Sequence, residues 1–136
     1  MPYIKQENRP DMDKIVKLMK KLEVDVSKDL VGILYNVQTK WHGSEFDKLV
    51  ELIIAMGVQA NGDLNYILYK YCLVTVSPSY NNYKRFIGGL EDAAANTTCR
   101  EYRWELRECA AEIRRRLLGP YEDTKIAENG DVTNEL

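Results

Sequence analysis

The stretch that decides the fold is residues 98–120, TCREYRWELRECAAEIRRRLLGP. Its apolar side chains recur at steps of three and four residues, as on one face of an α-helix, and form a seam of Tyr102, Leu106, Cys109, Ile113 and Leu117. Arginines lie on one flank of the seam and glutamates on the other. We therefore expect a long helix over residues 98–118, with its seam buried in a helical bundle, used for self-association, or both.

The pair Gly119-Pro120 predicts the end of this helix. Proline has no N–H to donate to the helix, and it disfavours helical backbone in the residue before it. We expect a short turn of helix around residues 121–128, ending at Asn129-Gly130. Residues 119–136 as a whole are expected to be a tail that folds back onto the body.

The rest of the chain also has helical spacing. Residues 1–10 read as an N-terminal arm that Tyr3 and Ile4 attach to the body. Residues 73–76, of which Val74, Thr75 and Val76 are β-branched, permit a short strand, but helix is favoured because no second strand is there to pair with it. The fold class is all-α, a single-domain helical bundle over residues 1–136. The expected helices before the long one are 11–23, 27–43 (opening at Ser27 or Asp29), 44–57, 63–76 and 80–95.

Size and composition narrow the class of protein. A chain of 136 residues can bury a core without a metal or a disulfide, and a net charge of −2 gives no overall field that would gather nucleic acid. The three cysteines have no paired spacing, so free buried thiols in a reducing compartment are expected. We find no signal peptide, membrane span, or DNA- or RNA-binding motif, and we expect a cytoplasmic protein without a cofactor.

Two groups of polar residues are unusual enough to suggest a ligand site. Mid-chain, Gly62 and Asp63 are explained by a helix start, but Asn65 and Tyr66 are not. At the end of the long helix, arginines 114–116 suit either the helix dipole and a pairing with Glu112, or an anion. We expect the ligand-binding residues to be Asn65, Tyr66, Arg115, Arg116, Tyr121, Asp123 and Asn129.

Catalysis has weaker support. The acidic pairs Glu105/Glu108 and Glu128/Asp131 resemble the paired acidic signature of all-α nucleotide pyrophosphohydrolases of the MazG and dUTPase-like family, which holds Mg²⁺. The alternative hypothesis is that these four residues bind the metal ion. His42 is the only histidine and would have to serve any serine or cysteine nucleophile.

Three blocks, in order along the chain, resemble an uncharacterised family of small proteins of bacteria and bacteriophages, DUF6899. They are MPYIKQENR at residues 1–9, GDLNY at 62–66, and PYED at 120–123 continuing through Lys125-Ile126 to ENGDV at 128–132. The family pattern also has a glutamate and two arginines before the last block, matched by Glu112, Arg115 and Arg116. The resemblance implies kinship but no established activity.

The residues together favour a non-enzymatic binding protein. We expect an arginine-bearing pocket for a small anionic or nucleotide-like ligand. In a phage, such a protein would act as a sponge that sequesters a signalling nucleotide. We also expect a homo-oligomer formed through the long helix. A Mg²⁺-dependent pyrophosphohydrolase and a protein-interaction module remain the alternatives.

Overall fold

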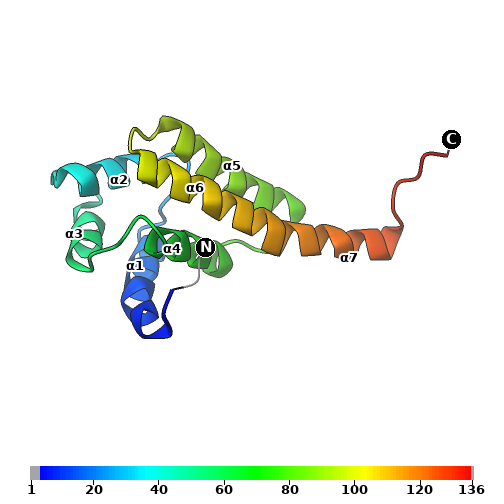
Figure 1. The fold of residues 1–136 in the computed structure, drawn as a ribbon, viewed down its shortest axis with the longest axis horizontal. Coiled ribbons are helices and arrows are strands. Elements are labelled where there is room, and N and C mark those ends of the chain that lie inside the picture. Colours follow the sequence, from blue (N-terminus) through cyan, green and yellow to red (C-terminus); the bar gives the residue numbers. More distant parts are fainter. Residues whose placement is uncertain (1–3, 136) are drawn as a thin grey trace.

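The computed structural model describes residues 4–135, and this part of the chain folds as one all-α domain without strands (Figure 1). The expected fold class is therefore confirmed. Within residues 4–135, no helix combines the length and the apolar character that crossing a membrane requires. The elements are η1 (Gln6–Asn8), α1 (Arg9–Lys21), α2 (Leu30–Thr39), α3 (Asp47–Ala55), α4 (Asp63–Thr75), α5 (Tyr80–Asn96), α6 (Arg100–Ile113), η2 (Arg114–Leu118) and α7 (Gly119–Asn129).

The first helices begin earlier, or are shorter, than the sequence suggests. Residues 6–10, expected to be part of an arm, are already helical, and Pro10 lies in the first turn of α1, where a missing N–H costs no helix bond. Ile4 packs against the core, whereas Tyr3 lies outside the described residues. The second helix spans only Leu30–Thr39, because Lys40 takes a left-handed conformation that ends it.

Polar side chains fix two helix starts. The Asp47 carboxylate accepts hydrogen bonds from the backbone N–H groups of Gly43 (2.8 Å) and Ser44 (2.9 Å) before α3. These bonds, that from Gly43 first, lower the pKa of Asp47. At the start of α5, the Ser79 hydroxyl accepts from the N–H of Asn82 at 3.0 Å.

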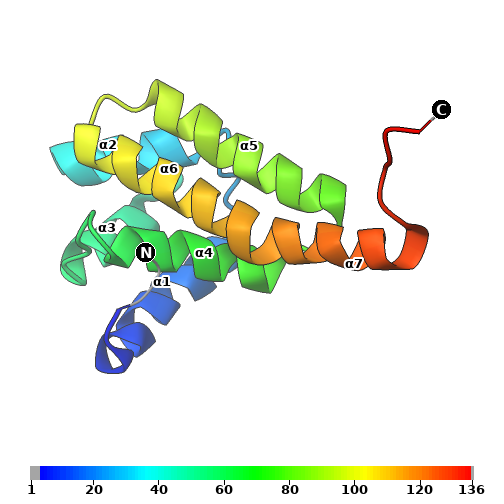
Figure 2. The same ribbon diagram turned by 45° about the vertical axis from the view of Figure 1, so that its right-hand side comes forward.

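Helix α4 is the centre of the bundle, packed against α1 on one side and α6 on another (Figure 2). The Tyr71 hydroxyl on α4 donates to the backbone carbonyl of Val24 at 2.7 Å and so links the α1–α2 connection to the core. On α6, the seam residues Leu106, Cys109 and Ile113 are fully buried between α4 and α5 of the same chain. The seam is therefore part of the chain's own core, which leaves other faces of α6 for any partner.

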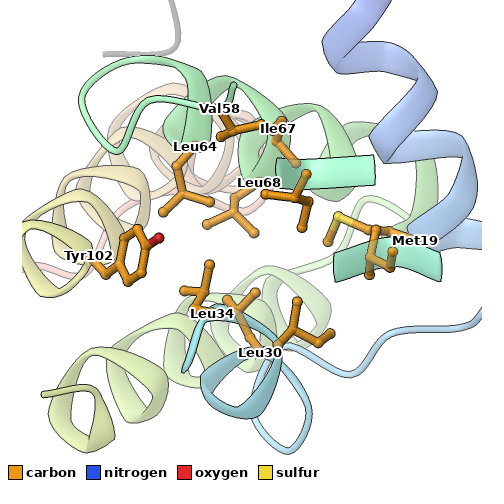
Figure 3. A pocket seen from close by; sticks show the side chains of 11 residues that line it. Met19, Leu30, Leu34, Val58, Leu64, Ile67, Leu68 and Tyr102 are labelled. Carbon is orange, nitrogen blue, oxygen red and sulfur yellow. The ribbon is translucent and has the colours of Figure 1, made fainter. Parts of the chain in front are cut away.

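The core contains a small apolar cavity of about 20 Å³, roughly the space of one water molecule. Figure 3 shows Leu64 and Leu68 of α4 facing Leu30 and Leu34 of α2 across it, with Tyr102 of α6 closing one side. Its lining is almost entirely hydrocarbon. This cavity is a packing defect of the core and offers no group that would hold a polar ligand.

The end of the long helix differs from the expectation. Helices α6 and α7 run into one another through η2, a π-helical stretch, and form one continuous rod that projects from the body (Figures 1 and 2). The N–H of Gly119 donates to the carbonyl of Arg114, five residues back, and Pro120 lies in the first turn of α7. The wider π turn carries the helix past the proline, so residues 119–129 neither stop it nor fold back.

The groups considered for nucleophilic catalysis are not arranged for it. Cys72 and Cys109 are buried, Cys99 is half-buried, and all three are free thiols. Burial raises the pKa of Cys72 to about 12 and that of Cys109 well above its ordinary value, which keeps both thiols protonated. His42 lies on the surface with its Nδ1 atom 3.8 Å from a Glu51 carboxylate oxygen. The two buried cysteines are thus structural, as expected of buried thiols.

Candidate functional site

The mid-chain motif connects α4 to its neighbours. Gly62 has φ +97°, which favours glycine, and its N–H donates to the Glu105 carboxylate on α6 at 3.2 Å. The Tyr66 hydroxyl donates to Asp13 on α1 at 2.8 Å, and burial raises the pKa of Tyr66 to about 12. Asn65 is fully buried, and within residues 4–135 its side-chain amide has no hydrogen-bond partner. Tyr66 thus has a structural role between α1 and α4.

The arginines of η2 also face their own chain. Arg115 forms an ion pair with Glu112, whose side chain is buried. The Arg116 guanidinium lies 4.8 Å from the ring centroid of Tyr69 on α4, a cation–π contact. These two contacts join the end of α6 to α4 and place the two arginines at a helix–helix junction.

The remaining expected site residues lie farther along the rod. The Tyr121 ring meets Tyr83 of α5 edge-on, with centroids 6.4 Å apart. Asp123 and Asn129 are exposed on α7. Because the helix continues through Pro120, the structure brings Arg116 to α4 but does not gather the seven expected residues into one pocket.

The first acidic pair of the alternative metal site lies on α6. Glu105 and Glu108 are one helical turn apart and so share a face, as their spacing predicts. Glu105 is buried and Glu108 is half-buried. The Glu105 carboxylate already accepts the backbone N–H of Gly62, and the charge of Glu108 is one of the smaller causes that raise the pKa of Glu105. Two carboxylates on one helix do not form a metal site by themselves, so this reading needs the second pair nearby.

The second acidic pair is far away, which contradicts the metal-binding arrangement. Glu105 and Glu128 are 23 residues apart on a continuous rod, about 35 Å at the helical rise, and Glu108 is about 30 Å from Glu128 by the same measure. Glu128 is paired with Lys125 at 3.2 Å, and Asp131 is exposed beyond the end of α7. Among residues 4–135, no cluster of three or more metal-ligating side chains is present. The rod that continues through Pro120 therefore keeps Glu105 and Glu108 apart from Glu128 and Asp131.

A different site lies on the outer face of α6. It is an open groove of about 690 Å³ between the start of α6 and the loop that precedes α4. Trp104 stands in it with 64% of its surface exposed, although large aromatic side chains are usually mostly buried. The groove is lined by Ala60, Asn61, Arg100, Glu101, Arg103, Trp104, Glu105 and Arg107. We call it the Trp104 groove.

The helix period sets the chemistry of this groove. Arg100, Arg103 and Arg107 come at steps of three and four residues, so they lie on the same face of α6 as Trp104 and line the same groove. Arg103 donates to the carbonyl of Thr97 at 3.3 Å, which fixes its direction. Arg100 and Arg107 have no ion pair or hydrogen bond with the described part of the chain.

A buried carboxyl lies at the edge of the groove. Glu105 is only 3% exposed, and its carboxylate accepts the N–H of Gly62. Burial raises the pKa of Glu105, while the hydrogen bond from Gly62 lowers it, and burial is the larger effect. The negative charge of this carboxyl is therefore less favoured than that of an exposed glutamate. The lining holds three arginines against Glu105 and the exposed Glu101.

The sequence contains a signal for this site. The predicted helix has arginines along one flank. The expected ligand-binding residues include neither Arg103 and Arg107 of this flank nor Trp104, which lies between them in the sequence. A tryptophan outside the apolar seam, with arginines one turn away on both sides, indicates an exposed aromatic platform. The other half of the groove, Ala60 and Asn61, comes from a distant loop and needs the fold.

The fold and the groove define a small all-α domain with a basic, tryptophan-bearing surface groove. Residues 1–132 match the family described as "Domain of unknown function (DUF6899)", and the chain belongs to that family. The resemblance seen in the sequence blocks is thereby confirmed. No curated protein and no solved structure matches the chain.

Proposed function

We propose that the chain is a non-catalytic binding protein whose Trp104 groove holds a small anionic ligand with an aromatic ring, such as a nucleotide. The observation that carries the proposal is the arrangement of Arg100, Arg103 and Arg107 around an exposed Trp104. This keeps the expected class of ligand but moves the site from Arg115 and Arg116, which contact their own chain.

The side chains of the groove match the parts of a nucleotide. Guanidinium groups bind phosphate oxygens with paired, charge-assisted hydrogen bonds. An indole ring stacks on a nucleobase, a contact worth about 1–3 kcal/mol per base. Arg100 and Arg107 can meet phosphates without first breaking an ion pair, so little stabilisation is lost on binding.

Binding without turnover would act by lowering the free concentration of the ligand. Such sequestration needs an accessible groove, and the Trp104 groove on α6 is open in the single chain. It does not need the metal-binding carboxylates of a pyrophosphohydrolase.

Tryptophan fluorescence offers a direct test. Trp41 and Trp104 are the two tryptophans, so a Trp41→Phe protein reports on Trp104 alone. We expect nucleoside triphosphates to quench this signal with saturation, and Arg100→Ala or Arg107→Ala to weaken binding about tenfold or more, since a charge-assisted bond contributes about 1.5–3 kcal/mol.

Arg85→Ala is the matched control, because Arg85 is an exposed arginine on α5 that lines a different hollow. Its affinity should equal that of the parent protein. An equal loss of nucleotide affinity in Arg85→Ala and Arg107→Ala would show that binding depends on the net charge of the protein and not on the Trp104 groove. Absence of saturable quenching by any nucleotide or aromatic phosphate would refute the proposal.

A further inference from the structure

Helix α7 is an arm that projects from the bundle (Figures 1 and 2). None of its residues is buried, and it is attached through η2 and the contact of Tyr121 with Tyr83. Beyond this attachment, Ile126 is 42% exposed and Val132 is 93% exposed. Because the helix projects from the bundle and none of its residues is buried, its surface can contact another molecule.

The arm is acidic. Residues 119–135 contain five carboxylate side chains and one basic side chain, Lys125. The opposite end of the same rod carries the arginines of the Trp104 groove. The face of α6 around Trp104 carries three arginines, with Glu101 and the buried Glu105 beside them, so the arginines of this face and the acidic arm are complementary in charge.

The two ends also share a face of the rod. Trp104 and Ile126 are 22 residues apart, about six turns of helix, so they project to nearly the same side. The π turn between them changes this phase by only a fraction of a turn. The same spacing is about 33 Å of rise, so within one chain the arm cannot reach the groove.

We propose that two copies of the chain pair antiparallel along their α6–α7 rods, each arm lying in the Trp104 groove of the other copy. A two-fold axis near Arg115 sets Ile126 of one copy against Trp104 of the other and Asp123 against Arg107. The contact is isologous, because the same surface is used twice. It closes on itself and yields a dimer.

The arginines nearest the axis are the main opposing effect, since like charges would meet there. Each of them is already engaged in its own chain: Arg114 with Glu91 at 3.1 Å, Arg115 with Glu112, and Arg116 with the Tyr69 ring. The carboxylates of Glu91 and Glu112 reduce the repulsion of Arg114 and Arg115 across the axis, whereas the contact with the Tyr69 ring does not by itself neutralise Arg116. The pairs at the two ends remain exposed to solvent, so the dimer should weaken as salt is raised.

This pairing is independent of which small anion the groove binds. It uses the same arginines, so a bound nucleotide and the arm of the second copy exclude one another. The dimer itself is tested without any ligand, which separates its failure from a failure of the proposed function.

The test is the molar mass of the full chain in solution, by sedimentation or by light scattering after size exclusion, at low and high salt. We expect a dimer at low salt that dissociates at high salt. Asp123→Arg and Arg107→Asp should each weaken dimerisation by at least tenfold, because each sets like charges opposite one another. The double variant Arg107→Asp/Asp123→Arg restores opposite charges and should recover the dimer.

Asp123 and Arg107 are both exposed, so the variants should keep the fold, and circular dichroism of each variant checks this. Glu45→Arg, which changes an exposed carboxylate in the loop before α3, is the matched control and should remain dimeric. A monomer at low salt overturns the proposal. A dimer that ignores Asp123→Arg, or single variants that the double variant does not rescue, overturns it too.

Discussion

Two adjacent glycines of α5, Gly88 and Gly89, have contrasting surroundings. A Cβ atom added at Gly88 meets nothing within 4 Å, whereas one at Gly89 lies 2.7 Å from Cγ2 of Val26 and 3.4 Å from the backbone N of Ser27. Alanine is favoured over glycine inside a helix by about 0.8–1 kcal/mol, while an overpacked core costs about 1–3 kcal/mol. Gly88→Ala should therefore raise the free energy of unfolding by about 1 kcal/mol. The Gly89→Ala variant should have a free energy of unfolding about 1–3 kcal/mol lower than that of the Gly88→Ala variant.

Val26 is the reason for this difference, because it is buried and its branched side chain has little freedom to turn away. Denaturant unfolding followed by circular dichroism measures both variants, with unchanged slopes as the condition for comparison. In the Val26→Ala background, Gly89→Ala should cost less than in the parent protein. If both glycine variants stabilise the protein equally, the connection between α1 and α2 does not pack on α5 as described.

Burial, backbone conformation and pKa give three more predictions. Leu106→Ala should lower the free energy of unfolding by about 2–5 kcal/mol, and Leu73→Ala, at a half-exposed position, by under about 1 kcal/mol; equal losses would contradict the assignment of the seam to the core. Gly62→Ala should cost about 1–2 kcal/mol, measured by thermal or denaturant unfolding, because φ is +97° there. The raised pKa of Glu105 means that the folded state binds the proton of the Glu105 carboxyl more tightly than the unfolded state does. The protonated carboxyl therefore contributes fully to stability below the unfolded-state pKa, and this contribution declines as pH rises through the folded-state pKa. Glu105→Gln should remove that decline, so the stability of the variant relative to the parent protein should increase when unfolding is measured from acid to neutral pH. A difference in free energy of unfolding that does not change with pH would refute this prediction.

The contrast between the two sites shows how far local sequence patterns reach. Arg115 and Arg116 are unusual in the sequence, and their pairing with Glu112 is one of the two readings that spacing alone leaves open. Local spacing shows which side chains share a helix face, but not which other helix covers that face. The contact of Arg116 with Tyr69, and the burial of Asn65, depend on α4 lying beside α6.

The acidic pairs illustrate the same limit. The spacing of Glu105 and Glu108 correctly places both on one face of α6, because a three-residue step is nearly one turn of a helix. Whether a second pair faces them depends on the direction that the chain takes after Pro120, and the straight rod carries Glu128 away.

The helices and the apolar seam of α6 were determined by the sequence itself. Apolar spacing and helix-start residues act within a few residues of one another, so they can be read locally, and Leu106, Cys109 and Ile113 are buried as their spacing predicts. Gly119-Pro120 is also a local signal, but the packing around it prevails.

Only the tertiary structure decided that the rod continues past Pro120 and where its two ends lie. A π turn can carry a helix through a proline when neighbouring packing, here Leu118 in the core and Tyr121 on Tyr83, holds both sides in line. The Trp104 groove likewise exists because the loop at Ala60 and Asn61 comes to rest beside α6, some forty residues away in sequence. Contacts of that range are set by the packing of the whole bundle, which no local pattern encodes.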